Sequence, residues 1–304
     1  MKELRSIVKG TLLENEPMSK HTSYGIGGPA FAYITPRDRD DLSEILKFSD
    51  KYDIPVHFIG SGSNLLVADD GIKGIVLSPA KSLTKLEIDH NSIIAESGVM
   101  LGKLVKESIK RNLTGLESLI GVPGTLGGAL VMNAGAFGGE ISNYLISVDV
   151  MTSRGKIRSY KSSDIAFSYR FSSFKTDEFI LLARFELKIE DPEVISKKRK
   201  KASSGRKTNQ PLRFRSAGSV FKNPKDHAAG YLIDKVGLKG KRIGDAEIST
   251  HHANFFINHG NASASEITEL IQLAKKAVLE EFDIELELEI KTIGFEKDQI
   301  EAYG

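Results

Sequence analysis

The segment from Gly121 to Gly139 is rich in glycine and contains no charged residue, which sharply limits what it can form. Two shorter glycine-rich stretches precede it, at residues 25–28 (GIGG) and 60–64 (GSGSN). Glycine lets the backbone approach a phosphate closely, and exposed N–H groups can donate to phosphate oxygens. Each stretch alone is more often an ordinary tight turn, but the three together predict a pocket for a dinucleotide or a flavin.

The spacing of these glycines excludes two common nucleotide-binding motifs. None of the three stretches reads G-x-G-x-x-G, and no Walker lysine follows any of them. The sequence therefore does not predict a separate Rossmann domain for a nicotinamide cofactor.

Hydrophobic periodicity predicts a mixture of helices and strands. Helices are expected over residues 38–52, 101–109 and 228–236, and a longer one after a Ser263 or Ser265 cap, with an apolar stripe of Ile267, Leu270, Ile271, Ala274 and Val278. Strands are expected over residues 56–59, 74–77, 93–96, 179–189, 253–257 and 284–291, with a hairpin turn at residues 153–156. Because these elements do not alternate as regular β-α-β units, the predicted fold class is α+β.

A strongly basic segment, residues 192–207, shows little apolar periodicity and marks the expected domain junction. A chain of 304 residues has room for two domains. We expect a first domain over residues 1–192 and a second over 193–304, whose final strand returns to the active site. The run at residues 197–201 lacks aromatic neighbours, so a solvated helix face is favoured over nucleic-acid binding.

Composition excludes several classes of protein. The net charge of +2 is too balanced to indicate a nucleic-acid-binding or membrane-surface protein. Without cysteine there is no disulfide, thiolate metal site or cysteine nucleophile. His251 and His252 lack well-spaced carboxylate partners, so no metal site is expected. Charges interrupt the first residues before an apolar run reaches signal-peptide length, and no run could span a bilayer, so a cytoplasmic protein is expected.

Several motifs occur in one order along nearly the whole chain, and together they resemble those of the UDP-N-acetylenolpyruvoylglucosamine reductase family. In the first half they are HTSYGIGGPA from His21, GSGSNLLV from Gly60 and GVPGTLGGALVMNAGAFGGEI from Gly121. In the second half they are SAGSVFKNP from Ser216, AGYLIDKVGLKGKRIGDAEIS from Ala229 and HANFFIN from His252. The short intervals from Arg170 to Ser219 and from Ser219 to Glu289 resemble the shorter, type II form of the family.

This resemblance implies a fold and a reaction. The first domain would bind FAD non-covalently, with the p-cresol methylhydroxylase or vanillyl-alcohol oxidase type of fold, and the smaller α+β domain would bind substrate. NADPH, a co-substrate, would reduce the flavin and leave. The enolpyruvyl ether of UDP-N-acetylglucosamine would then enter the same pocket and be reduced to UDP-N-acetylmuramate, a peptidoglycan precursor needed for cell-wall synthesis, cell shape and division. The expected protein is a monomer with no nucleic-acid or membrane partner.

The resemblance also assigns three catalytic residues. Arg170, in the motif Tyr169-Arg170-Phe171-Ser172, would bind the substrate carboxylate and stabilise the enolate. Ser219, in GSVFKNP, would donate the proton, and Glu289 is selected in the motif that runs to Gly294. From the residues alone, Arg170 could be a surface arginine and Ser219 part of a turn. Glu289 shares its expected strand face with Glu285 and Glu287, so periodicity does not choose among the three.

The expected binding residues follow from the same motifs. Flavin contacts are expected from Gly27, Gly28, Gly60, Ser61, Gly62, Ser63, Asn64, Gly121, Pro123, Gly124, Gly127, Gly128, Asn133, Ala134 and Gly135. Substrate contacts are expected from Tyr169, Lys222 and Asn223. His251, Arg215 and Asp245 depart from the usual family pattern, where lysine, proline and glycine are common. Two alternatives stay open: a flavin-dependent oxidase of the same superfamily, and a non-catalytic module that binds nucleotide sugar or RNA.

Overall fold

The computed structural model describes residues 1–296, and the chain forms two compact units. Unit 1 contains residues 1–14, 32–61 and 74–206, and unit 2 contains residues 15–31, 62–73 and the chain from 207 onward. The chain crosses between the units within three strands, β1 (Thr11–Pro17), β2 (Pro29–Thr35) and β5 (Ile72–Leu77), between Ser61 and Gly62, and near the end of helix α5 (Pro192–Asn209). The assignment of residues 1–192 to flavin and 193–304 to substrate concerns function and remains a prediction.

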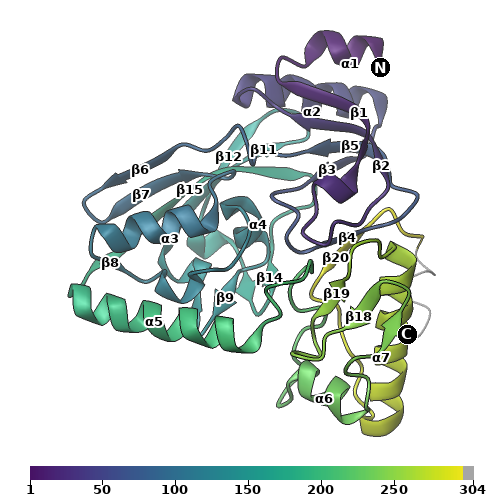
Figure 1. Ribbon diagram of the computed structural model, residues 1–304. Coiled ribbons are helices and arrows are strands. Elements are labelled where there is room, and N and C mark those ends of the chain that lie inside the picture. The colour runs from purple at the N-terminus through teal and green to yellow at the C-terminus, as the bar shows by residue number, and fades with distance from the viewer. Residues whose placement is uncertain (297–304) are drawn as a thin grey trace. The chain divides into compact units, whose positions relative to one another are not determined.

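A five-stranded antiparallel sheet forms the largest layer of unit 1 (Figure 1). Its order is β12 (Ile157–Lys161), β11 (Leu145–Thr152), β15 (Glu178–Glu186), β7 (Ser92–Glu96) and β6 (Leu86–Asp89). The expected turn at residues 153–156 joins β11 to β12, where Met151 pairs with Ile157. Helix α3 (Leu101–Lys110) covers this sheet, because Leu101, Leu104 and Val105 share one buried cluster with side chains of β7 and β11.

A second sheet, in the order β1-β2-β5-β3, packs against helix α2 (Arg39–Tyr52). Strand β3 covers Val56–Phe58. The helix begins after Asp38, whose carboxylate accepts a hydrogen bond from the backbone N–H of Asp41. The helix expected over residues 38–52 is confirmed, and its N-cap carboxylate satisfies one of the four free N–H groups of the first turn.

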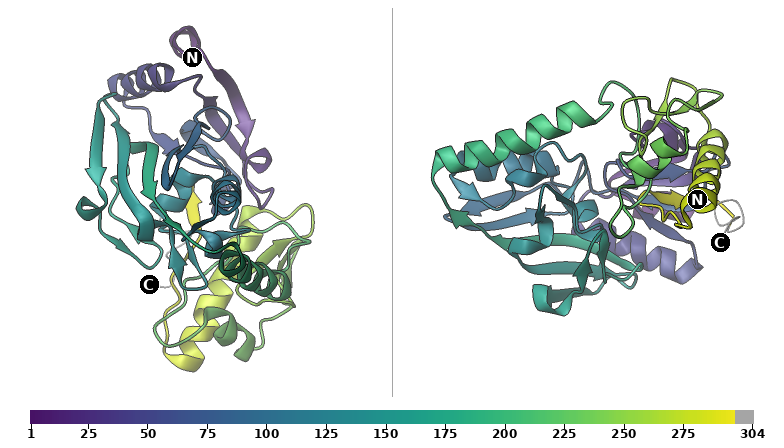
Figure 2. Two further views of the ribbon diagram at one scale, coloured as in Figure 1. Left: turned by 90° about the vertical axis from the view of Figure 1, so that its left-hand side faces the viewer. Right: turned by 90° about the horizontal axis from the view of Figure 1, so that it is seen from below.

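Short elements complete unit 1. The helices are α1 (Lys2–Ile7), α4 (Leu126–Val131) and α5 (Pro192–Asn209), the last of which ends beyond the unit boundary at residue 206. Three two-stranded ribbons pair β8 (Leu113–Thr114) with β16 (Lys188–Ile189), β9 (Gly135–Ala136) with β10 (Gly139–Glu140), and β13 (Phe167–Ser168) with β14 (Phe171–Ser172). The 3-10 turns are Glu117–Leu119, Ile141–Tyr144 and Ser162–Asp164. Figure 2 shows α5 as one uninterrupted helix. Its basic sequence carries no continuous apolar stripe, so periodicity alone did not predict a helix there; Ile195 and Ala202 are its buried side chains among those described.

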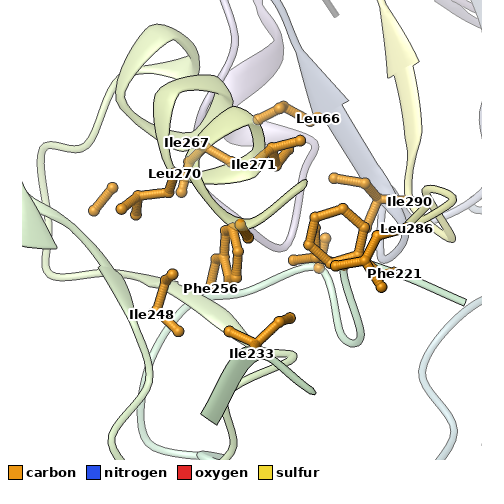
Figure 3. Close-up of a cluster of buried hydrophobic side chains, with 14 of the residues drawn as sticks. Leu66, Phe221, Ile233, Ile248, Phe256, Ile267, Leu270, Ile271, Leu286 and Ile290 are labelled. Atoms are coloured by element: carbon orange, nitrogen blue, oxygen red, sulfur yellow. The ribbon is translucent and has the colours of Figure 1, made fainter. Parts of the chain in front are cut away.

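Unit 2 is built around helix α7 (Ala264–Phe282) and a three-stranded sheet, β17 (Arg242–Ile243), β18 (Ala246–Ile248) and β19 (Phe256–Asn258). Strand β4 (Leu65–Val67) pairs in parallel with β20 (Lys291–Ile293). The 3-10 turn Met18–Lys20 and helix α6 (Ala229–Lys235) complete the unit. Figure 3 shows the core, where Phe221 and Phe256 lie among aliphatic side chains from α7 and from the segment before β20.

Helix α7 confirms the predicted stripe, since Ile267, Leu270, Ile271, Ala274 and Val278 are all buried. Two strand predictions were wrong in extent. Strand β19 begins at Phe256, because a turn closed by the Phe255 N–H and the His252 carbonyl precedes it. Residues 284–290 form no regular strand, although Leu286 and Ile290 are buried and Glu285 and Glu287 exposed, as the alternation predicted.

Among residues 1–296, no helix is both long and apolar enough to cross a bilayer.

The cap of α7 gives a test of the fold. Ser263 accepts a hydrogen bond from the Glu266 N–H, while the Glu266 carboxylate accepts one from the Ser263 N–H. We predict that Ser263→Ala lowers the free energy of unfolding by about 1 kcal/mol, the usual contribution of an N-cap. Ser265→Ala is the matched control, because the exposed Ser265 hydroxyl bonds Asp69 rather than the helix end. Chemical denaturation measures both, and equal losses would contradict the assignment of the cap to Ser263.

Candidate functional site

The expected binding residues divide between the two units. Unit 1 contains Gly60, Ser61, Gly121, Pro123, Gly124, Gly127, Gly128, Asn133, Ala134, Gly135 and Tyr169 with Arg170. Unit 2 contains Gly27, Gly28, Gly62, Ser63, Asn64, Ser219, Lys222, Asn223 and Glu289.

In unit 1, the glycine-rich backbone lies beside buried hydroxyl groups. The hydroxyls of Ser61, Ser97 and Thr125 are buried and have no hydrogen-bond partner within residues 1–296. A Cβ on Gly60 would lie 2.2 Å from Oγ1 of Thr125, and one on Gly127 would lie 3.1 Å from Cβ of Ser97. Buried polar groups in proteins nearly always have a hydrogen-bond partner. Unpaired hydroxyls beside the backbone of glycine residues therefore indicate a binding site for a polar ligand.

These features fit the polar portion of FAD. Hydroxyls that can both donate and accept, next to glycine backbone, suit a pyrophosphate or ribityl chain. Ser97 and Thr125 were missed by sequence reasoning, since each is a single hydroxyl in its stretch and only the fold brings them beside Gly127 and Gly60.

Arg170 lies in the two-residue turn between β13 and β14, with φ of 57°. Its Nη1 donates to the carbonyl oxygen of Gly135 at 3.2 Å, and its Cζ lies 4.9 Å from the centre of the half-exposed Tyr169 ring. The structure thus brings the Tyr169-Arg170 motif together with Gly135, which the sequence selected in a different motif. The guanidinium group of Arg170 can bind a carboxylate, while its contacts with the Tyr169 ring and the Gly135 carbonyl hold it in place.

A second arginine lies near Arg170. The Arg206 side chain passes Gly121, where a Cβ would lie 3.2 Å from Cδ of Arg206. Burial lowers the pKa of Arg206, and the positive charge of Arg170 lowers it further. Its Nε is buried and has no hydrogen-bond partner in the described part of the chain. Two neighbouring guanidinium groups, one incompletely paired, favour an anionic ligand. Sequence reasoning missed Arg206, because it treated its segment only as a basic junction.

The glycines of unit 2 have a structural explanation. A Cβ on Gly62 would lie 1.9 Å from the carbonyl oxygen of His21, and one on Gly28 would lie 2.0 Å from that of Asp69. At these positions glycine allows two backbone segments of unit 2 to cross in contact. Their flavin contacts, like those expected of Gly27 and Ser63, remain predictions.

Ser219 and Glu289 lie on neighbouring segments of unit 2. The Glu289 N–H donates to the Val220 carbonyl at 2.8 Å, and Ser219 forms a bridge with Phe255. Asn64 donates from its amide to the Glu289 carbonyl at 3.1 Å. Glu289 is partly buried, whereas Glu285 and Glu287 are exposed. Burial therefore separates Glu289 from the acidic residues that periodicity could not distinguish.

The Ser219 segment is held rigidly by Asn254. This buried side chain accepts from the Phe221 N–H at 2.9 Å and donates to the Phe221 carbonyl at 2.8 Å. The Val220 N–H donates to the Asn254 carbonyl at 2.8 Å. An amide group that pairs both backbone groups of one residue fixes the segment in one conformation.

The two expected substrate residues after Ser219 have protein partners. Lys222 Nζ lies 2.9 Å from Oε2 of Glu287, and the Asn223 side chain accepts from the Ala229 N–H at 3.1 Å, at the start of α6. Their contacts with substrate remain predictions.

The two adjacent histidines each have a partner other than a metal. His251 Nε2 lies 2.7 Å from the Thr208 carbonyl oxygen, and His252 Nδ1 accepts from the Asn254 N–H at 3.2 Å. Burial lowers the pKa of His252, which favours the neutral ring. The described residues contain no cluster of three metal-ligating side chains.

Comparison with known proteins gives matches for both halves of the chain. Residues 210–293 match the family model of the UDP-N-acetylenolpyruvoylglucosamine reductase C-terminal domain, and residues 30–161 match that of an FAD-binding domain. The chain is 40% identical over 291 residues to UDP-N-acetylenolpyruvoylglucosamine reductase 2 of Bacillus cereus, covering 95% of each chain. It is 42% identical over 284 residues to the reductase of Clostridium tetani, covering 93% of this chain and 92% of the relative.

A solved structure gives the same result. The crystal structure of UDP-N-acetylenolpyruvylglucosamine reductase from Thermus caldophilus is 34% identical and superposes with a TM-score of 0.80 over 94% of this chain and 99% of that chain. The predicted α+β fold with an FAD-binding domain is therefore confirmed.

The unpaired hydroxyls generate a prediction. We expect the purified protein to be yellow, and Thr125→Val to weaken FAD binding by about 3- to 10-fold, the scale of one lost hydrogen bond. The unfolding free energy of the FAD-free protein should stay constant or rise, because the variant removes an unpaired buried hydroxyl. Equilibrium titration with FAD and denaturation of the FAD-free protein measure the two effects.

Ser82→Ala is the matched control for this experiment. Its hydroxyl is also buried without a partner among the described residues, but none of the described glycine-rich stretches has Ser82 as its close neighbour. Equal weakening of FAD binding by both variants, or none by Thr125→Val, would contradict a role for the Thr125 hydroxyl.

Proposed function

Because the chain belongs to the UDP-N-acetylenolpyruvoylglucosamine reductase family, we propose that it reduces the enolpyruvyl ether of UDP-N-acetylglucosamine to UDP-N-acetylmuramate. The observation that carries the proposal is the 40% identity over 95% of the chain to a reductase of this family. The chain is an FAD-containing oxidoreductase by its family. We propose NADPH as the reductant and non-covalent binding of FAD.

The reduction needs a hydride at the methylene carbon and a proton at the carbon that carries the carboxylate. When bound and reduced by NADPH, the flavin would supply the hydride. Negative charge then develops on the carboxylate-bearing carbon and is delocalised into its carboxylate, so fixed positive charge at that carboxylate stabilises the transition state.

Arg170 is proposed to bind that carboxylate. A guanidinium can hold a carboxylate through two parallel hydrogen bonds, and it stays charged at every working pH. Its contact with the Gly135 carbonyl and its position beside the Tyr169 ring support a fixed orientation. Arg206 adds a second positive charge in the same region, which supports binding of an anionic substrate.

Ser219 is proposed to donate the proton, with Glu289 as the catalytic carboxylate beside it. The backbone bonds that join the Ser219 and Glu289 segments through Val220 support their action together. A serine hydroxyl is a weak acid, so its proton must be delivered within a hydrogen-bonded site that compensates the charge left behind.

The remaining assignments complete the proposal. Residues 1–192 are assigned to flavin binding and residues 193–304 to substrate binding, in a monomeric cytoplasmic enzyme of peptidoglycan precursor synthesis, with no nucleic-acid or membrane partner. Oxidation of NADPH that requires the enolpyruvyl substrate distinguishes this reductase from an oxidase. A colourless protein that binds RNA at physiological salt would instead indicate a non-catalytic module.

Ser219→Ala separates proton donation from the other steps. We expect this variant to retain FAD and to be reduced by NADPH at close to the normal rate, because that step needs no proton from Ser219. Oxidation of the reduced variant by enolpyruvyl substrate should slow by about 10²–10⁴-fold, the usual contribution of a general acid. Ser219→Cys should recover part of the loss. Stopped-flow spectroscopy measures both half-reactions, and normal substrate reduction in Ser219→Ala would rule out the assignment.

Glu289→Gln should likewise preserve reduction by NADPH and abolish most substrate reduction. Glu285→Gln is the matched control, because it removes an exposed carboxylate of the same stretch, four residues before Glu289. We expect kcat of the Glu285 variant to stay within about 3-fold of wild type, because an exposed charge makes only weak interactions. Equal losses of kcat in the two variants would show that the acidic stretch acts through its general charge.

A further inference from the structure

The backbone of Arg170 has an unusual conformation that neighbouring residues maintain. Its φ of 57° lies in the left-handed region, which few residues other than glycine, asparagine and aspartate adopt. Such a conformation persists only where surrounding contacts compensate its cost. Hydrogen bonds hold the turn on both sides: Ser172 Oγ donates to the Val131 carbonyl at 2.7 Å, and the Ser168 carbonyl accepts from Nδ2 of Asn133 at 3.1 Å.

Asn133 joins this turn to a second element. Its side chain is fully buried, and the same Nδ2 that donates to the Ser168 carbonyl also donates to Oε2 of Glu140 at 2.9 Å. Both amide hydrogens are therefore used within unit 1. Its Oδ1 has no partner in the described part of the chain, so toward a cofactor Asn133 could only accept a hydrogen bond.

Glu140 supports the backbone that contacts the Arg170 guanidinium. In the β9–β10 ribbon Glu140 pairs directly with Gly135, and the Gly135 carbonyl accepts from Arg170 Nη1. A Cβ on Gly135 would lie 3.0 Å from Cγ of Glu140, so the Glu140 side chain lies against the Gly135 backbone. One hydrogen of the Asn133 Nδ2 group therefore fixes the backbone of the arginine turn, and the other holds the Glu140 side chain beside the acceptor of its guanidinium.

We propose that Asn133 and Glu140 are positioning residues that set the orientation of the Arg170 guanidinium toward the substrate carboxylate. The inference rests on the role proposed above for Arg170. It gives Asn133 a function different from the flavin contact expected from its motif, and it adds Glu140, which no motif argument selected.

Asn133→Asp tests this inference without straining the backbone at position 133, where φ is 41°, since aspartate, like asparagine, tolerates positive φ. It places a carboxylate against the Glu140 carboxylate and removes the donor to Ser168. We expect FAD content and reduction by NADPH to stay near wild type. Substrate reduction should slow by about 10²-fold, the effect of a misplacement of about 1 Å at a reacting group.

Exchanging the donor and the acceptor of the Asn133–Glu140 hydrogen bond should restore the rate of substrate reduction. Glu140→Gln alone keeps an acceptor oxygen for Asn133, so we expect a change within about 3-fold, as for a weakened hydrogen bond. In Asn133→Asp with Glu140→Gln, the glutamine amide can donate to the new carboxylate, and much of the lost rate should return. No rescue would overturn the proposed pairing.

A double-mutant cycle with Arg170→Lys tests whether the effect passes through Arg170. If Asn133 acts by orienting the guanidinium, Asn133→Asp should change the rate by less than about 3-fold in the Arg170→Lys background. An undiminished loss there, or a loss of FAD or of reduction by NADPH in Asn133→Asp alone, would overturn the inference. Asn91→Asp is the matched control, because the Asn91 amide donates to the Leu187 carbonyl elsewhere in unit 1.

A measurement independent of activity separates this inference from the proposed function. The Nε–H resonance of Arg170, assigned by its absence from the Arg170→Lys spectrum, should shift or broaden in Asn133→Asp and return in the rescued pair. An unchanged resonance would overturn the inference. A wild-type enzyme that fails to reduce the enolpyruvyl substrate, with the resonance shifted as expected, would overturn the proposed function alone.

Discussion

Irregular backbone in each of the two units must pair its buried polar groups without the help of regular strands, and side-chain amides meet this requirement. Asn254 pairs both backbone groups of Phe221, Asn133 pairs the Ser168 carbonyl, and Asn258 donates to the Tyr24 carbonyl at 2.8 Å. An amide carries a donor and an acceptor in fixed geometry, as a peptide group does. Since an unpaired buried backbone group costs about 1–3 kcal/mol, these asparagines hold segments that could not otherwise stay in place.

Glycine has two different roles in the chain, which the sequence does not distinguish. At Gly28 and Gly62 a Cβ would collide with backbone carbonyls, so glycine is required for two segments to cross. At Gly60 the nearest group is the side-chain hydroxyl of Thr125, which no described residue pairs. The first kind of glycine stabilises the fold, and the second leaves polar groups available to a ligand. Glycine content therefore supported both interpretations of each stretch, an ordinary tight turn and a ligand-binding segment.

The sequence predicted those elements that depend on interactions between residues close together in the chain. Helices α2 and α7 were predictable, because their caps and apolar stripes are local and strongly periodic. For α5 only the basic run at residues 197–201 was predicted to lie on a helix face; the bounds of the helix were not, since only a few of its side chains are buried and its charges hide the pattern. The strand expected over residues 284–291 was wrong in extent for a related reason. Its side chains alternate between core and solvent, but its backbone bonds go to Val220, Lys222 and Asn64 rather than to one continuous partner strand.

The candidate site was predictable only where a motif kept its residues close in sequence. Arg170, Ser219 and Glu289 were each selected by such a motif. Arg206 and Ser97 lie outside the quoted motifs, and their significance depends on contacts with residues distant along the chain. Glu140 lies inside the Gly121 motif, but only the fold shows that its side chain contacts Asn133 and Gly135.

The electrostatics of unit 1 explain why positioning contacts are needed at all. Arg170 and Arg206 repel each other, and burial of Arg206 removes water that would otherwise weaken the repulsion. Two flexible guanidinium groups would relieve this repulsion by moving apart, and the field at the site would fall. The bond to the Gly135 carbonyl and the tethers at Ser168 and Ser172 oppose that movement. An anion that enters such a site meets positive charge already in place, so little free energy is needed to organise it when negative charge develops in the transition state.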